Sequence, residues 1–421
     1  MQGREGAAET ASARKMKWNW EEILMSEHRL EPLIKAAVEK YQPLAVELSD
    51  DLYANPELPD QEFRSSAKVV ELLRNAGYEV EYPFDGRETA FRGVIGNGSG
   101  PSAAILVEYD ALPGLGHACG HNASCAMSVL AALALADLKD RFPGTLYVIG
   151  TPAEEDNGAK VGMAKRGVFD GMSLAIMAHS WSGGTHVTDM DVLSLQCYLV
   201  EFRGLSAHAA ASPWSGHNAL SAARKFLDLI DARRECFTPD IRVNGIITDG
   251  GKAPNILPDR AEVRLEFRTD SQGKLRLMDD IIRKCARGAA IALDCEVSFT
   301  EGFEGFDDMV CVPALEQEVK AVLEGMGEVC REKLPPSGSS DVGNASYRCP
   351  TVQPLVSLCD PPYALHTGEF RDETVKPAAH RAIATGGRLI ASMVCRTLTD
   401  PEFRQRVQDS FEASRAAKLE L

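Results

Sequence analysis

The chain has 421 residues, long enough for two domains, and its 44% hydrophobic and 25% charged residues are typical of a folded globular protein. Its 61 Asp and Glu residues outnumber its 45 Lys and Arg residues, which gives a formal net charge of -16. So acidic a surface repels phosphate groups, and only 7% of the residues are aromatic. Nucleic acids and anionic membranes are therefore not expected partners.

The sequence shows no recognisable export signal. Residues 1–18 contain no apolar core and no cleavage pattern, and no apolar run approaches the roughly 18 residues of a membrane span. We therefore expect a cytoplasmic protein. The 11 cysteines are odd in number and irregularly spaced, which in a reducing compartment predicts free thiols.

The first part of the chain alternates between helical and strand patterns. Residues 31–75 carry apolar residues three and four apart, which predicts helices, with a break at Asn55-Pro56. Strands are expected at 78–82, 91–95, 103–109, 145–150 and 174–177, and helices at 122–138 and 159–166. This alternation predicts an α/β fold with a mostly parallel sheet covered by helices on both faces.

The pattern changes after about residue 191. It then predicts a strand at 193–202, a helix at 217–231, strands at 241–247 and 261–268, a helix at 273–291 and a strand at 296–300. This order is the split βαβ arrangement of a ferredoxin-like α+β unit. We therefore expect an inserted domain at 192–302 within a discontinuous first domain at 1–191 and 303–421.

A glycine-rich stretch at residues 114–122 offers the first candidate metal ligands. Cys119 and His121 lie two apart around a glycine, after one predicted strand and before an apolar helix. Thiolate and imidazole both bind zinc well, and ligands gather at the carboxyl ends of strands in open α/β sheets. The alternative is a turn with a core cysteine and a surface histidine. The spacing is not that of a G-x-G-x-x-G dinucleotide loop.

Three further strand ends carry similar side chains. Glu154 and Glu155 follow one apolar strand, His179 follows the next, and His366 lies near the C-terminus. Adjacent carboxylates in a loop are usually solvated, and a lone strand-end histidine is more often structural. Two carboxylates so close together at an active edge need a cation or a shared proton, however. Four strand ends that each offer Cys, His or Glu together predict a dinuclear metal site in which one carboxylate acts as a base.

The order of the motifs resembles a known family. The run YDALPGLGHACGHN extends from Tyr109 to Asn122, and NPEL at 55–58, GLSAHA at 204–209 and NILP at 255–258 accompany it. The chain resembles the dinuclear zinc amidohydrolases and metallopeptidases that include aminoacylase, glutamate carboxypeptidase and succinyl-diaminopimelate desuccinylase. It is most similar to the branch with cysteine in the first metal motif, near p-aminobenzoyl-glutamate hydrolase and related dipeptidases.

The resemblance implies a set of roles in the first domain. Cys119 would bridge two divalent ions, zinc or alternatively manganese or cobalt, and Glu154 would be the general base. Asp110 would orient a ligand from behind. The remaining ligands would be His121, Glu155, His179 and His366.

The resemblance also implies a lid and dimerisation domain in a homodimer. His208 would reach the partner subunit's site and steady the oxyanion, while Asn255 and Arg268 would hold a substrate carboxylate. The alternative for Arg268 is a pair with an internal carboxylate. The expected activity is hydrolysis of a small amide: an N-acyl or aryl-amide amino acid, or a dipeptide.

Other interpretations of the sequence are weaker. A catalytically inactive binding or regulatory subunit of the same fold is the alternative, although the ligands and Glu154 are all present. No G-x-S-x-G elbow supports a serine nucleophile. A purely structural zinc site would favour a cysteine-rich tetrahedron rather than this mixed set.

Overall fold

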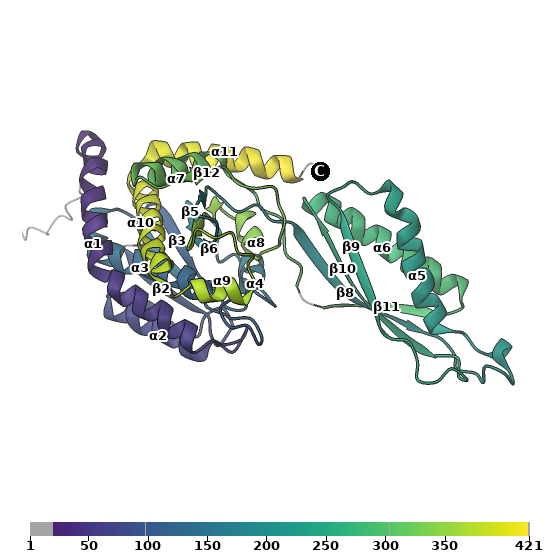
Figure 1. The fold of residues 1–421 in the computed structure, drawn as a ribbon. Coiled ribbons are helices and arrows are strands. Elements are labelled where there is room, and N and C mark those ends of the chain that lie inside the picture. Colours follow the sequence, from purple (N-terminus) through teal and green to yellow (C-terminus); the bar gives the residue numbers. More distant parts are fainter. Residues whose placement is uncertain (1–19, 97, 303, 420–421) are drawn as a thin grey trace, which may run out of the picture.

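The polypeptide forms a large helix-rich body and a smaller, elongated body that projects from it (Figure 1). This computed structural model describes residues 20–96, 98–302 and 304–419. The N-terminal segment that the sequence analysis compared with a signal peptide lies outside these residues. The C-terminal helix packs on the large body beside the junction, so the chain leaves the large body, builds the smaller one and returns.

A six-stranded mixed sheet forms the centre of the large body, in the order β1-β2-β4-β3-β5-β13. β3 runs parallel to β4 and β5, and β13 runs parallel to β5, whereas β2 is antiparallel to both β1 and β4. The bounds are β1 (Glu79–Glu81), β2 (Phe91–Gly96), β3 (Ser102–Val107), β4 (Thr145–Gly150), β5 (Leu174–Ile176) and β13 (Thr351–Val352). The predicted α/β class is confirmed.

Alternating side chains of β3 bury both faces of this sheet. Ala103, Ile105 and Val107 join one apolar core, while Ala104 and Leu106 join another on the opposite face. The first core includes α1 (Trp20–Ala54), α2 (Phe63–Asn75), α3 (His121–Asp137), α7 (Pro313–Gly325), α10 (Pro377–Thr399) and α11 (Pro401–Leu419). The second includes α4 (Ala159–Lys165) and α8 (Val342–Ser346). The layers are therefore helix, sheet and helix, as the sequence predicts.

A second, small sheet lies beside the first, in the order β12-β7-β14-β6. Its strands are β6 (His179–Trp181), β7 (His186–Val187), β12 (Cys330–Arg331) and β14 (Leu355–Ser357), and α9 (Gly368–Glu373) follows them in the chain. Strands of two or three residues carry no readable periodicity, so the sequence analysis did not predict this sheet. One expectation changes as a result: His179 does not end the strand at 174–177 but opens β6 in the second sheet.

The smaller body is an antiparallel sheet with two helices on one face. The strand order β11-β8-β10-β9 matches the split βαβ arrangement. The elements are β8 (Ser194–Arg203), α5 (Ala219–Arg233), β9 (Arg242–Asp249), β10 (Arg260–Thr269), α6 (Gln272–Ala292) and β11 (Glu296–Glu301). It has its own apolar core. We call this body the lid; the domain boundaries at 192 and 302 stay a prediction.

Two expectations about the whole chain can be compared with the structure. All 11 cysteines are free, as predicted. Among the described helices, none combines the length and the apolar character needed to cross a membrane.

Candidate active site

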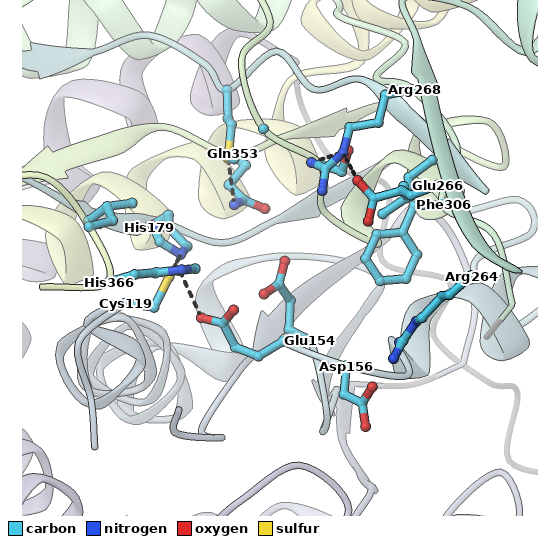
Figure 2. Close-up of a pocket in the computed structure, with 16 residues that line it drawn as sticks. Cys119, Glu154, Asp156, His179, Arg264, Glu266, Arg268, Phe306, Gln353 and His366 are labelled. Carbon is cyan, nitrogen blue, oxygen red and sulfur yellow. Dashed lines mark hydrogen bonds and ion pairs between the residues drawn. The ribbon is translucent and has the colours of Figure 1, made fainter. Parts of the chain in front are cut away.

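A cavity of about 580 Å³ lies where the lid meets the large body. Figure 2 shows ligand-type side chains on one wall and charged lid side chains on the other. The large body contributes Cys119, Glu154, Glu155, Asp156, His179, Gln353 and His366, and lid strand β10 contributes Arg264, Glu266 and Arg268. The structure thus gathers residues from all four predicted stretches: Cys119 and Glu154-Glu155 follow the parallel strands β3 and β4, which end at the same edge, while His179 comes from β6 and His366 from the turn before α9.

Gly120 allows Cys119 and His121 to face the same site. Its φ is +84°, in the left-handed region, and a Cβ there would lie 2.5 Å from the Cβ of Ser180. Only glycine fits such a turn without strain. Helix α3 begins directly afterwards at His121, so the turn fixes both side chains at the buried start of a helix.

Two other site residues hold unusual backbone conformations. Ala153, directly before Glu154, has φ +61°, and His366 has φ +63°. Non-glycine residues seldom adopt this region, which costs about 1–3 kcal/mol and persists where the surrounding structure enforces it. At this site the strain turns a carboxylate and an imidazole toward the cavity (Figure 2).

Two donor groups meet at Cys119. Cys119, His121 and His179 place ligand atoms within 4.8 Å of one another. Cys119, Glu155 and His366 do the same. The Cys119 Sγ atom lies 3.7 Å from His179 Nε2, and His366 Nε2 lies 3.3 Å from Glu155 Oε1. Sharing of one thiol by both groups is the arrangement expected of a ligand that bridges two ions.

The buried donors also pass a test for cation binding. His121 Nε2 is fully buried and makes no hydrogen bond among the described residues, although the carboxylates of Glu108 and Glu154 lie 3.5 and 3.9 Å from it. A buried imidazole nitrogen without a hydrogen bond is costly, and a metal ion between it and the carboxylates would satisfy it. Thiolate, imidazole and carboxylate together suit zinc and related divalent ions. The residues present therefore fit a dinuclear metal centre.

Asp110 holds two of these candidate ligand residues in place. Its Oδ1 atom lies 3.0 Å from His121 Nδ1, and its Oδ2 atom accepts a hydrogen bond of 3.0 Å from the Glu155 backbone N–H. When Nδ1 of His121 donates to Asp110, Nε2 is left free to bind a metal. Similarly, His179 Nδ1 lies 2.9 Å from the carbonyl oxygen of Ser180, which frees Nε2 toward Cys119.

Burial controls the ionisation of Glu154 and Cys119. Burial, together with the charges of Glu108 and Glu155, raises the pKa of Glu154 well above its ordinary value. Burial and the neighbouring Glu155 charge likewise raise the pKa of the Cys119 thiol. A cation would reverse the second effect, because a coordinated thiol is deprotonated. Metal binding at Cys119 is therefore expected to release a proton.

A buried lysine behind Glu154 escaped the sequence analysis. Lys160 Nζ donates to Glu108 Oε1 at 2.7 Å and to Asp341 Oδ1 at 2.5 Å, and all three side chains are fully buried. Burial alone would raise the pKa of Glu108, but the Lys160 ammonium lowers it. Glu108 Oε2 lies 3.5 Å from His121 Nε2, so this network contacts the ligand cluster directly. The one feature of the sequence that could have indicated this network is a lysine, Lys160, in the first turn of an otherwise apolar helix after Gly158.

The lid residues divide into two groups. Arg268 lines the cavity, and its Nε atom donates to Glu266 Oε1 at 2.8 Å, so it makes the internal pair that the sequence analysis kept as an alternative. His208 and Asn255 lie on exposed loops beyond the outer end of the lid sheet. From Leu195 in the cavity wall to Arg203, β8 spans about 26 Å. His208 therefore lies far from the cavity of its own chain.

Comparisons with known proteins show which sequences this chain is similar to. The sequence profile of peptidase family M20/M25/M40 matches residues 104–391, more than half of the chain. The Xaa-Arg dipeptidase of Mus musculus is 31% identical over 91% of this chain and 93% of its own length. One of the polypeptides of the p-aminobenzoyl-glutamate hydrolase of Escherichia coli is 29% identical over 63% of this chain and 59% of its own length.

A solved structure shares the fold. A Bacillus subtilis protein described as a dinuclear metal-binding peptidase of the M20 family superposes with a TM-score of 0.67 at 19% identity. The superposition covers 86% of this chain and 99% of that chain. At this identity the match supports the two-body architecture and says nothing about the substrate.

The shared thiol generates a prediction about metal affinity. Replacing Cys119 by Ser should weaken the binding of zinc by at least about tenfold, because serine is a poor ligand for the soft, bridging position. Isothermal titration of metal-depleted protein measures this change. Cys125→Ser is the matched control, since Cys125 is equally buried a few residues later but belongs to neither donor group. Equal loss in both variants would show that the wrong thiol was assigned.

Proposed function

Because the chain belongs to peptidase family M20/M25/M40, whose members are metallopeptidases and amidohydrolases, we propose that it hydrolyses a small linear amide with two divalent ions and Glu154 as the general base. The observation that carries this proposal is the convergence of two donor groups on Cys119, with Glu154 beside them. The ligands would be Cys119, His121, Glu155, His179 and His366. Zinc suits this set best, and manganese and cobalt are the alternatives.

The residues divide the work of hydrolysis. The two ions, when bound, would polarise the amide carbonyl and lower the pKa of an attacking water toward neutrality. Glu154 lies on the cavity wall with its Oε2 atom 3.9 Å from His121 Nε2, and it accepts the proton of that water. Glu154 can then return the same proton to the leaving nitrogen. Asp110 orients His121 and the Glu155 backbone during both steps.

The proposed substrates are N-acyl or aryl-amide amino acids and dipeptides with a free carboxylate. The names of the two relatives, a dipeptidase and an aryl-amide glutamate hydrolase, support this class. We place the carboxylate beside Arg268, whose guanidinium forms a planar fork on the lid wall of the cavity. Asn255 would add a hydrogen bond from a partner subunit, since it lies on the outer loops of the lid.

The role of Glu154 separates an enzyme from a binding protein. Glu154→Gln should abolish the turnover of amide substrates while two equivalents of metal remain bound, because the variant keeps all five ligands and loses only the base. Metal analysis and rate assays with zinc, manganese or cobalt test this. If neither the wild type nor the variant hydrolyses any amide but both bind it equally, the chain is an inactive binding or regulatory subunit.

The outer position of His208 supports a homodimer. We propose that His208 of the partner subunit completes each site, because β8, about 26 Å long from Leu195 to Arg203, separates the loop of His208 from the cavity of its own chain. A mixture of His208→Ala and Glu154→Gln chains should then regain activity, since one site of the mixed dimer has both residues intact. Recovery measured after subunit exchange tests the proposal. A fully active monomer would contradict it.

Recognition of the substrate carboxylate can be measured separately. Amidating that carboxylate, or replacing Arg268 by Ala, should lower kcat/KM by the equivalent of about 1–3 kcal/mol, the range for a hydrogen bond to a charged group. In the parent protein Arg268 is already paired with Glu266, which weakens its interaction with a substrate carboxylate. We therefore expect a loss near the lower end of this range. Arg242→Ala removes an exposed arginine opposite Arg268 on β9 and is the control. Equal rates for the acid and its amide would place specificity in the acyl group.

A further inference from the structure

One lid strand presents three charged side chains to the cavity. In β10, Val263, Leu265 and Phe267 are buried in the lid core. The intervening residues Arg264, Glu266 and Arg268 therefore share the opposite face, and all three line the cavity (Figure 2). The positions of these charges follow from strand alternation alone.

Two other arginines of this strand are already neutralised by neighbours. Arg268 donates to Glu266 at 2.8 Å and to the Ser339 hydroxyl at 3.3 Å. Arg260, at the outer end of the strand, contacts three carboxylates, which belong to Glu201, Asp249 and Glu262. The pairing of Arg268 with Glu266 leaves little net charge at that end of the cavity wall.

Arg264 differs from both. Within residues 30–96, 98–302 and 304–419, no hydrogen bond or ion pair engages its guanidinium, and the residue is exposed. Its cross-strand neighbours are Leu199 on β8 and Ile246 on β9, so the sheet provides no carboxylate opposite it. In Figure 2 its side chain extends along the cavity wall toward the loop that carries Asp156. Arg264 is thus a cation of the cavity whose partner is absent from its own sheet.

We propose that Arg264 is a specificity-determining residue that binds a second negative group of the substrate, in addition to the carboxylate assigned to Arg268. The proposal rests on the proposed amide hydrolysis at this site and narrows its substrate class to amides with two carboxylates. Arg264 and Arg268 lie four residues apart on an extended strand, about 13 Å between their Cα atoms. That spacing suits two groups of one elongated substrate.

The chemistry of the wall favours an anion at this position. A guanidinium on a cavity wall binds a carboxylate with two parallel hydrogen bonds, and a substrate ammonium there would meet a like charge. The second carboxylate can belong either to the leaving amino acid, as in an acidic side chain, or to the acyl group. The two sources share one chemistry, and matched substrates distinguish them.

The test measures binding without turnover. The zinc-loaded Glu154→Gln protein is titrated calorimetrically with two matched pairs of ligands. N-benzoyl-L-glutamate and N-benzoyl-L-glutamine differ in charge on the leaving side, and N-succinyl-L-alanine and N-butanoyl-L-alanine differ in charge on the acyl side. We expect the dicarboxylate of one pair to bind about 10- to 100-fold more tightly than its monocarboxylate counterpart, and the pair concerned identifies the source.

Substitution then assigns the preference to Arg264. Arg264→Gln should remove the difference between the matched ligands, Arg264→Lys should retain part of it, and the affinity for the monocarboxylate ligands should change less than about threefold. Arg287→Gln, at an exposed arginine of α6, is the matched control and should keep the preference. Because Arg264 is exposed, its variants should fold, which circular dichroism checks.

Two results would overturn the proposal. Either dicarboxylates gain nothing over monocarboxylates in the parent protein, or Arg264→Gln weakens the binding of all four ligands equally, as a general disturbance of the cavity wall would do. Turnover of the same four amides by the wild-type enzyme is measured separately. Absence of turnover with preserved selective binding would contradict the proposed hydrolysis and leave the role of Arg264 supported.

Discussion

The concentration of buried negative charge at one edge of the main sheet is the constraint on which the site depends. Glu108, Asp110 and Asp341 are fully buried, and Glu154 and Glu155 are nearly so. A buried carboxylate is tolerated only when cations or hydrogen-bond donors compensate it. Lys160 compensates Glu108 and Asp341, and Asp110 binds His121 and a backbone N–H. Among the described residues, only imidazoles pair with the carboxylates of Glu154 and Glu155 on the cavity wall. The cavity wall thus carries an excess of negative charge, which multivalent cations are suited to compensate.

The fold creates this concentration through parallel strands and strained turns. β3 and β4 end side by side, so Glu108, Asp110 and the Glu154-Glu155 loop reach the same edge although more than 40 residues separate them. Gly120 and the positive φ of Ala153 then turn the side chains inward over one or two residues. Lys160 lies at the start of α4, after the loop that carries Glu154 and Glu155. Its backbone N–H and its ammonium both donate hydrogen bonds to Asp341, which holds that loop in place. The same residues therefore serve folding and chemistry.

Sequence patterns predicted the long elements and the ligand cluster because both rest on local signals. Strand and helix periodicity placed β3, β4, α3 and the four lid strands within a few residues, and Cys119, His121 and the Glu154-Glu155 pair follow β3 and β4 as expected, whereas His179 begins β6. The strands β6, β7 and β14 could not be predicted, because two or three residues are too few to show a period. The sheet that begins at His179 was therefore missed. The Lys160 network was also missed, because a lysine on an apolar helix reveals its role only when Glu108 and Asp341, 52 and 181 residues away, are placed beside it.

The two walls of the cavity carry opposite charge, and this polarity connects the two bodies. The large-body wall is carboxylate-rich and requires cations, while the lid wall offers Arg264 and Arg268 with one neutralising Glu266. Under the proposed function, a substrate anion bound at the lid wall would lie across the cavity from the candidate metal ligands, which face that wall in Figure 2. Since the ions would attract any anion, discrimination among substrates has to come from the spacing and pairing of the lid charges. The internal pair of Arg268 limits the contribution of that residue, so the unpaired Arg264 is where a change in the lid should alter substrate choice most.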